Sequence, residues 1–147
     1  MAREDFGYKS EFRVRFGETD LQGVVFNANY LLYVDTAQMD YLRHLGVTYA
    51  EMRARGHDIV IAEAHLRFRS PARFDEVIEA YARISEIRNS SIQMDYELYE
   101  KESGRLLAEA QTTYVWIQAD SGHPVRVPPY LRGAVRAFER REDIEPE

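Results

Sequence analysis

Residues 19–44, TDLQGVVFNANYLLYVDTAQMDYLRH, join a short polar loop to a long stretch of helical spacing. Apolar side chains recur there at intervals of three and four residues, which places them on one face of a helix. They are Tyr30, Val34, Ala37, Tyr41 and Leu45. Gly46 is a natural stop for a helix. We therefore predict a helix from about Asn29 to His44, preceded by a loop that holds one acid, Asp20, and one glycine, Gly23.

Strands account for most of the remaining chain. Glu11–Phe16 alternates apolar and charged residues, as a half-buried strand does. A short helix with a capping box at Thr48 follows the long one and ends near Gly56. Four long strands come next, separated by breaks at Ser70-Pro71, at Asn89-Ser90 and at the glycine turn 102–105, and a last short helix is predicted after Pro128. The expected strands are 57–69, 76–88, 91–100 and 106–118, and the expected helix is 130–140.

This order of elements predicts an α+β fold in which a five-stranded antiparallel sheet packs on one long helix. Successive strands joined by tight turns form antiparallel sheets, and the sheet is the only large surface that can bury the apolar face of the helix. We expect a single domain over residues 1–147, with its core at about 8–130. The charged ends, 1–5 and 141–147, are expected to have little order.

The strand expected at 57–69 indicates that subunits associate. Strict alternation places one set of its side chains on the inner face of the sheet, namely Val60, Ala62, Ala64, Leu66 and Phe68. The outer face then carries Ile59 and Ile61 beside ionisable residues. Because a mixed face of this kind is typical of a subunit interface, we expect a homodimer or a larger homo-oligomer.

Composition excludes several classes of function. The net charge of −6 makes the surface as a whole a poor match for a polyanion, so we expect no nucleic-acid partner. No apolar run approaches the ~18 residues of a membrane span, and the first residues lack the apolar stretch of a signal peptide. We therefore expect no membrane segment and a cytoplasmic location. The absence of cysteine excludes disulfides and cysteine nucleophiles.

Motifs of the common hydrolases and nucleotide-binding proteins are missing from the sequence. No serine lies in a Gly-x-Ser-x-Gly frame, no His-Glu-x-x-His is present, and there is no glycine-rich phosphate loop. The four histidines are scattered, so we expect no metal site.

Carboxylates are therefore the remaining candidates for chemistry. Asp20 precedes the apolar run Val24–Phe26, and burial against that run would raise its pKa and make it a better base. The helix that follows offers unpaired N–H groups in its first turn, which favour an oxyanion. Asp20 can equally be a turn or capping residue. The competing acid, Asp35, lies within the helix and either serves chemistry or hydrogen-bonds a neighbour.

Residues 15–43, RFGETDLQGVVFNANYLLYVDTAQMDYLR, resemble the signature of the hotdog-fold acyl-CoA thioesterases of the 4-hydroxybenzoyl-CoA thioesterase class. The family frame is Asp-x-x-Gly-Val-Val-Phe/Tyr-x-x-x-Tyr. It is filled here by Asp20, Gly23, Val24, Val25, Phe26 and Tyr30. Two later blocks are weaker but follow in the right order. They are FRSPARFDEVIE, 68–79, and ISEIRNSSIQM, 84–94.

The resemblance implies a hotdog fold, a sheet wrapped around one helix in a homodimer or homotetramer. It implies that Asp20 is the catalytic carboxylate, as base or nucleophile. The backbone N–H of Asn27 would polarise the thioester carbonyl, where many members carry His or Tyr. Gly23 would permit a close chain approach, and Tyr30, with Tyr33, would shape the acyl pocket.

The resemblance also implies which residues meet coenzyme A. Arg88 and Ser91 fall on positions that contact its nucleotide end. Two basic residues that follow in the benzoyl-CoA enzyme are here Asn89 and Ser90. Contact with the phosphates is therefore expected to be weaker, or to come from the basic residues near the C-terminus, Arg126 or Arg132.

The function so implied is hydrolysis of an acyl-CoA thioester to a free acid and coenzyme A, without metal or organic cofactor. Two alternatives remain open on the same fold. One is a non-catalytic module that binds acyl-CoA or acyl carrier protein. The other is a dehydratase, which would usually need a histidine near its acid, and none lies close to Asp20 in the sequence.

Overall fold

A computed structural model describes residues 3–147 of the chain. Its strands are β1 (Lys9–Arg13), β2 (His57–Phe68), β3 (Val77–Ile87), β4 (Ser91–Glu100) and β5 (Leu106–Gln118). Its helices are α1 (Asn29–His44), α2 (Tyr49–Ala54) and α3 (Pro129–Glu139), with two 3-10 turns, η1 (Arg3–Asp5) and η2 (Phe16–Glu18). The predicted bounds of α1, β4 and β5 are confirmed. Over this range no helix has both the length and the apolar character needed to cross a membrane.

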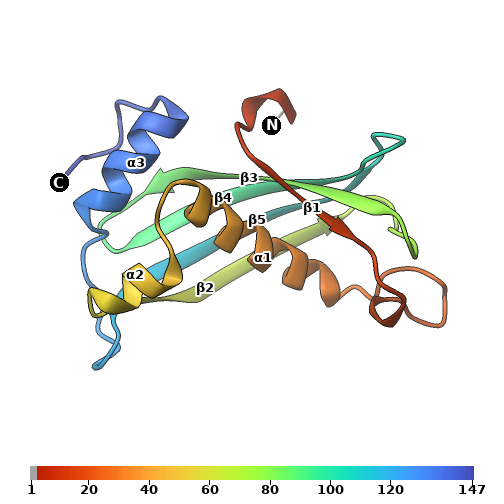
Figure 1. Ribbon diagram of the computed structural model, residues 1–147, viewed down its shortest axis with the longest axis horizontal. Coiled ribbons are helices and arrows are strands. Elements are labelled where there is room, and N and C mark those ends of the chain that lie inside the picture. The colour runs from red at the N-terminus through yellow and green to blue at the C-terminus, as the bar shows by residue number, and fades with distance from the viewer. Residues whose placement is uncertain (1–2) are drawn as a thin grey trace.

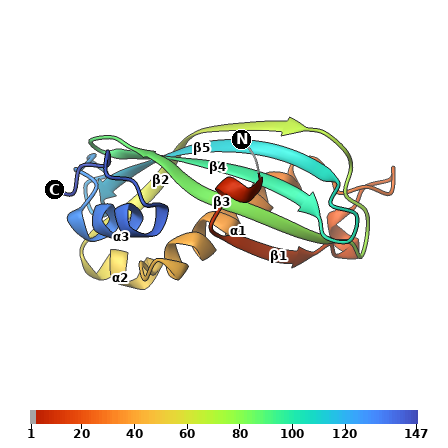
Figure 2. The same ribbon diagram turned by 90° about the horizontal axis from the view of Figure 1, so that it is seen from above.

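The five strands form one antiparallel sheet in the order β1-β3-β4-β5-β2. All three helices lie on the same side of this sheet, with α1 over its middle and α3 near one end (Figures 1 and 2). The predicted α+β architecture, a five-stranded antiparallel sheet packed on one long helix, is confirmed.

The core lies between α1 and the inner face of the sheet. Val34, Ala37 and Tyr41 on α1 are fully buried, as are the facing side chains of the central strands. Burying an aliphatic or aromatic side chain of this size stabilises a fold by about 1.5–3 kcal/mol. The facing side chains include Ile78, Ala80, Ile84, Met94 and Leu98. The apolar side chains that recur at helical spacing in the sequence thus form the face by which α1 packs on the sheet.

The position of β2 differs from the expectation of successive strands joined by tight turns. Such turns join β3 to β4 and β4 to β5, but residues 69–76 carry the chain from the edge strand β2 across the sheet to β3, which lies next to the opposite edge strand β1. Backbone hydrogen bonds from Arg69 and Ser70 to Leu107 hold the start of this connection. As a result β2 pairs only with β5, and its other edge is free in the chain.

A β-bulge in β2 overturns the predicted assignment of its faces. Ile61 pairs with Tyr114 and Glu63 with Thr113, so Ala62 has no partner and the alternation of side chains reverses. Ile59 and Ile61 therefore lie on the helix side of the sheet, where they line a cleft beside α1. The mixed outer face from which we inferred a subunit interface does not contain them.

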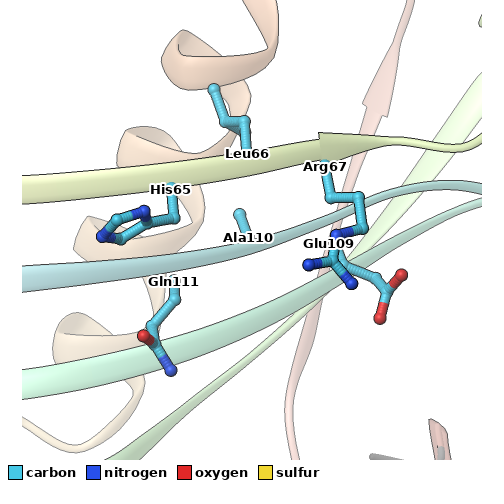
Figure 3. Close-up of a pocket in the computed structure, with 6 residues that line it drawn as sticks. All are labelled: His65, Leu66, Arg67, Glu109, Ala110 and Gln111. Atoms are coloured by element: carbon cyan, nitrogen blue, oxygen red, sulfur yellow. The ribbon is translucent and has the colours of Figure 1, made fainter.

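The outer face of β2 and β5 is instead polar. Figure 3 shows Leu66 directed toward α1, while Arg67, Glu109 and Gln111 point to the opposite side of the sheet. Neighbouring Arg69 makes an ion pair with Glu109 at 2.6 Å. A face with this charge is a poor candidate for an apolar subunit interface.

The first strand also ends earlier than the alternation predicts. Pairing with β3 stops at Arg13, and Val14 adds one more hydrogen bond to Glu76. The chain then turns, because the side chain of Glu18 accepts the Arg15 N–H at 2.8 Å and closes the turn η2. Phe16 consequently leaves the sheet and is 77% exposed, with its ring edge-on to Phe74.

The C-terminal residues, for which we expected little order, pack against α3. Ile144 is buried, and the guanidinium of Arg136 donates to the carbonyl oxygens of Glu142 and Ile144. Arg132 is 1% exposed and its guanidinium also reaches this segment, at the carbonyl of Glu145. Two arginines of α3, the buried Arg132 and the half-buried Arg136, thus hold a highly charged tail in place by its backbone.

Candidate functional site

A small hairpin, residues 18–26, carries the predicted catalytic acid. Its two sides are joined by the Asp20 N–H to the Val24 carbonyl and by the Phe26 N–H to the Glu18 carbonyl, both at 2.9 Å. The hairpin leads directly into α1 and lies beyond the end of β1 (Figure 1). Asp20 and the start of α1 are therefore brought together by local structure alone.

Asp20 is half-buried at the turn of this hairpin. Its Oδ1 accepts the Gln22 N–H at 2.8 Å, so the residue has the turn role that its loop position indicated. Among residues 3–147 no donor bonds its second oxygen, Oδ2. One carboxylate oxygen thus shapes the turn while the other is open to a substrate or a water molecule.

Gly23 is required for a reason other than the predicted one. Its φ of 78° lies in the left-handed region, which glycine adopts without the penalty of a side chain. A Cβ at this position would meet nothing within 4 Å inside the chain, so no close approach of the backbone demands glycine. The turn that presents Asp20 demands it.

The N-terminus of α1 has no side-chain cap. Its N-cap position is Ala28, and no acidic residue lies in the first turn. No acceptor within the described part of the chain bonds the backbone N–H of Asn27 or of Ala28. These donors lie at the positive end of the helix dipole, where a developing negative charge is stabilised.

Tyr30 is buried and secures the hairpin rather than presenting its hydroxyl to a pocket. The hydroxyl oxygen accepts the Ala72 N–H at 3.0 Å, and the Ala72 carbonyl accepts the Val25 N–H at 2.8 Å. Burial raises the pKa of the Tyr30 phenol. The Tyr30 ring contacts Phe68 edge-on. The connection between β2 and β3 is thereby fastened to both the hairpin and α1.

Glu18 is a buried acid that the sequence did not distinguish. Burial alone would raise its pKa, but hydrogen bonds from the Arg15 N–H, the Tyr33 hydroxyl and the Arg15 guanidinium outweigh that effect and lower it. The Tyr33 hydroxyl donates to Oε1 of Glu18 at 2.8 Å. No pattern in the sequence indicates this role, because the partner, Tyr33, is fifteen residues away along the chain, within α1.

A cleft between α1 and β2 is polar at one side and apolar at the other. Ile59 and Ile61 line it from β2, and Asp35 and Gln38 line it from α1. The Tyr114 hydroxyl donates to Oδ1 of Asp35 at 2.8 Å, and burial raises the pKa of that phenol. Gln38 is 1% exposed, and its Nε2 has no partner in the described residues. Asp35 therefore accepts a hydrogen bond from Tyr114, as expected if its role is structural.

The histidines occupy separate environments. His57 lies near the Tyr130 hydroxyl, and His65 lies on the outer face beside Glu63. Over residues 3–147 no group of three or more His, Asp and Glu side chains is placed to hold a metal ion.

The residues expected to meet coenzyme A flank the turn between β3 and β4. Arg88 is exposed and pairs with Glu86 at 3.0 Å, and its N–H donates to the Ser91 carbonyl. Arg132 is excluded as a phosphate ligand, because its buried guanidinium donates to main-chain carbonyls, including those of Arg88 and Asn89. Arg126 is exposed and bonds the Asn89 side chain at 2.9 Å. Of the two basic residues considered, only Arg126 is accessible.

The two parts of the predicted site lie at opposite ends of the sheet. The Asp20 hairpin adjoins the start of β3, and Arg88 follows its end (Figure 1). A strand of this length spans roughly 30 Å at about 3.3 Å per residue. Asp20, Gly23, Asn27 and Tyr30 lie on this hairpin or at the start of the helix that follows it, whereas Arg88 and Ser91 are remote from them.

Comparison with known proteins identifies the family of this chain. The model of the thioesterase-like superfamily matches residues 14–135. The chain belongs to the thioesterase-like superfamily. Among members and relatives, a 1,4-dihydroxy-2-naphthoyl-CoA hydrolase of Thermosynechococcus vestitus is 32% identical over 88% of this chain and 92% of that protein. The acyl-CoA thioester hydrolase YbgC of Escherichia coli is 27% identical over 79% and 86%.

A solved structure extends this comparison to the fold. The gentisyl-coenzyme A thioesterase BH1999 has a TM-score of 0.79 and 27% identity, covering 87% of this chain and 99% of that one. The predictions of a hotdog fold and of a place among the thioesterases are confirmed. The roles of individual residues in this superfamily member stay predictions.

Proposed function

We propose that the protein hydrolyses an acyl-CoA thioester to a free acid and coenzyme A. The observation that carries the proposal is the pairing of Asp20, which has one open carboxylate oxygen, with the uncapped N-terminus of α1. A base or nucleophile and a set of oxyanion donors are what thioester hydrolysis requires. The superfamily and the names of its members support the same chemistry.

The reaction has two routes from this arrangement. In one, Asp20 takes a proton from water, and the hydroxide formed attacks the thioester carbonyl carbon. In the other, the Asp20 carboxylate attacks that carbon itself, and water hydrolyses the resulting anhydride. In both, the carbonyl oxygen becomes negative beside the N–H groups of Asn27 and Ala28, the C–S bond breaks, and the thiolate of coenzyme A leaves and gains a proton.

We further propose that the complete site needs two chains. A two-fold axis beside the free edge of β2 would pair the two β2 strands antiparallel. That arrangement brings the Arg88 end of one protomer next to the Asp20 end of its partner. The edge offers apolar surface for this contact, since large side chains are about half exposed along it. They are Ile61 and Phe68 on β2 and Tyr49, which lines the same cleft as Ile61.

An arginine in this edge should break the dimer. Ile61→Arg places a charge where the proposed interface is apolar, and we expect the particle of about twice 17.2 kDa to become a monomer by sedimentation equilibrium. Phe74→Arg is the matched control, because Phe74 is similarly exposed at the opposite edge of the sheet. A wild-type protein that sediments as a monomer would contradict the two-chain site.

The cleft beside α1 favours a polar, compact acyl group. Asp35, Gln38 and Tyr114 supply hydrogen-bonding groups beside Ile59 and Ile61, and a long alkyl chain would leave the Nε2 of Gln38, which has no partner in the described residues, still unpaired. The relatives named for dihydroxynaphthoyl-CoA and gentisyl-CoA act on hydroxylated aromatic thioesters. We propose a hydroxylated aromatic acyl-CoA as the substrate class.

The direct test is thiol release from a panel of acyl-CoAs. Hydroxybenzoyl-CoA, benzoyl-CoA, short-chain and long-chain acyl-CoAs are each incubated with the purified protein, and free thiol is measured. We expect the hydroxylated aromatic thioester to show the highest kcat/KM. Release from none of them, with binding of acyl-CoA retained, would instead favour the non-catalytic binding module.

Arg88 should act on binding and not on chemistry. Because its guanidinium is exposed and remote from Asp20, Arg88→Ala is expected to raise KM for acyl-CoA by about tenfold with kcat unchanged. A substrate truncated to the pantetheine thioester should lose this sensitivity, since it lacks the nucleotide. An equal fall in kcat for both substrates would argue against the nucleotide contact.

A further inference from the structure

We propose that Glu18 is a positioning residue for the hydrolysis, one that fixes the Asp20 hairpin relative to the first turns of α1. The inference rests on the proposed function of Asp20 and the α1 N-terminus. It assigns no chemical step to Glu18. It explains why a carboxylate is buried two residues before Asp20, in a segment whose other long side chains are largely exposed.

The burial of Glu18 stands out against its surroundings. Glu18 is 9% exposed, whereas Phe16 is 77% exposed and Leu21 is fully exposed. A buried carboxylate is costly unless hydrogen bonds satisfy it. Here both carboxylate oxygens and the main-chain carbonyl of Glu18 accept hydrogen bonds, so the residue is an anchor with many contacts.

The main-chain carbonyl of Glu18 joins three parts of the site. It accepts the Phe26 N–H at 2.9 Å, which closes the base of the hairpin. It also accepts a hydrogen bond from Nδ2 of Asn29 at 2.9 Å, and Asn29 is the first residue of α1. A single oxygen therefore connects the strand leading to Asp20, the strand leading away from it and the start of the helix.

The carboxylate of Glu18 reaches further into the helix. Oε1 accepts the Tyr33 hydroxyl and the Arg15 N–H, each at 2.8 Å. Oε2 accepts Nε and Nη2 of Arg15 at 3.1 and 3.0 Å. The Tyr33 ring is itself fixed, because it is buried and stacks on Phe12 at a centroid distance of 5.7 Å. The hairpin is thus linked to the helix at a rigid side chain.

These contacts make Glu18 unsuited to proton transfer but suited to positioning. Its oxygens are occupied by donors, and those donors lower its pKa, so it is a weaker base than an ordinary glutamate. A hairpin that is free to shift would separate Asp20 from the N–H groups of Asn27 and Ala28. Displacements of about 1 Å can cost roughly 10²-fold in rate.

A double-mutant cycle on kcat tests this role. Glu18→Ala should lower kcat by about 10²-fold and Tyr33→Phe by about tenfold, with KM within about threefold of the wild type. The double variant should be no slower than Glu18→Ala, because the effect of Tyr33 passes through Glu18. Glu18→Gln should recover most of kcat, since its amide oxygen still accepts from Tyr33. A catalytic base would not be rescued by glutamine.

The control is a second hydrogen-bonded tyrosine–glutamate pair, which lies on β4. The Tyr99 hydroxyl donates to Glu97 at 2.6 Å on the outer face, and Tyr99→Phe should change stability as much as Tyr33→Phe without changing kcat. Equal kcat values for Tyr33→Phe and the wild type, or losses that simply multiply in the double variant, would overturn the proposal.

Amide hydrogen exchange provides a readout that does not depend on activity. In Glu18→Ala and Tyr33→Phe, the Phe26 amide and the amides at the start of α1 should exchange at least about tenfold faster than in the wild type, and Tyr99→Phe should leave them unchanged. Unchanged exchange in all variants would overturn the positioning role, even in a chain that hydrolyses no thioester. If these amides exchange faster in the variants but the wild-type protein hydrolyses no thioester, the structural role of Glu18 is supported and only the proposed function is contradicted.

Discussion

Replacing Asp20 by asparagine should lower kcat for the best acyl-CoA substrate by about 10³-fold, within the range that a general base contributes. The amide oxygen of asparagine can still accept the Gln22 N–H, so the turn should be retained. What is lost is the open oxygen that takes a proton or attacks the thioester. Thiol release under saturating substrate, together with an unchanged thermal melting curve, measures the two effects separately.

The control for this experiment is Asp40→Asn, which removes a carboxylate from the same region of sequence. Asp40 lies near the end of α1 and bonds Ser10 and Arg43, away from the hairpin. Its kcat should match that of the wild type. If Asp20→Asn keeps kcat within about threefold of the wild type, Asp20 is not the catalytic acid and Asp35 becomes the candidate.

The local parts of the molecule were predictable from the sequence. The spacing of Tyr30, Val34 and Ala37 identified α1, and glycine turns bounded β4 and β5, because these signals depend on neighbours within a few residues. Asp20 and Asn27 lie within and just after one short hairpin, so their relative position also depends on local structure, while their roles stay predictions. Gly23 was identified correctly as special, but the cause was a positive φ and not a close approach.

The nonlocal parts were not predictable, for definite physical reasons. A bulge at Ala62 changes the direction of every preceding side chain in β2, yet an alternating sequence has the same appearance with or without it. Glu18 receives its hydrogen bond from Tyr33, fifteen residues further along the chain, and no local sequence pattern indicates that contact. The polar side of the cleft depends on the register that places Tyr114 opposite Ile61 and against Asp35, which only the folded sheet defines.

Arg132 connects stability to the predicted nucleotide end of the site, and its replacement should have the largest effect on folding. Its Nε donates to the Val127 carbonyl at 2.7 Å, and Nη2 donates to the Arg88 carbonyl at 2.6 Å. Further contacts to Asn89 and Glu145 leave the guanidinium enclosed by acceptors. Arg132→Met fills similar space but removes the guanidinium donors; the Asn89 carbonyl keeps the Val127 N–H, whereas the carbonyls of Val127 and Arg88 lose their Arg132 donors, at a cost of about 1–3 kcal/mol each.

We expect Arg132→Met to lower the free energy of unfolding by about 3–5 kcal/mol in urea titrations, and Tm by about 10 °C for a chain of this size. Arg126→Met is the control: Arg126 is exposed, and its loss should cost less than about 1 kcal/mol. Because Arg132 holds the main chain of Arg88 and Asn89, the folded fraction of Arg132→Met should also show a raised KM for acyl-CoA. A loss of stability no greater than that of Arg126→Met would mean that water satisfies these carbonyls and that the guanidinium is not their essential partner.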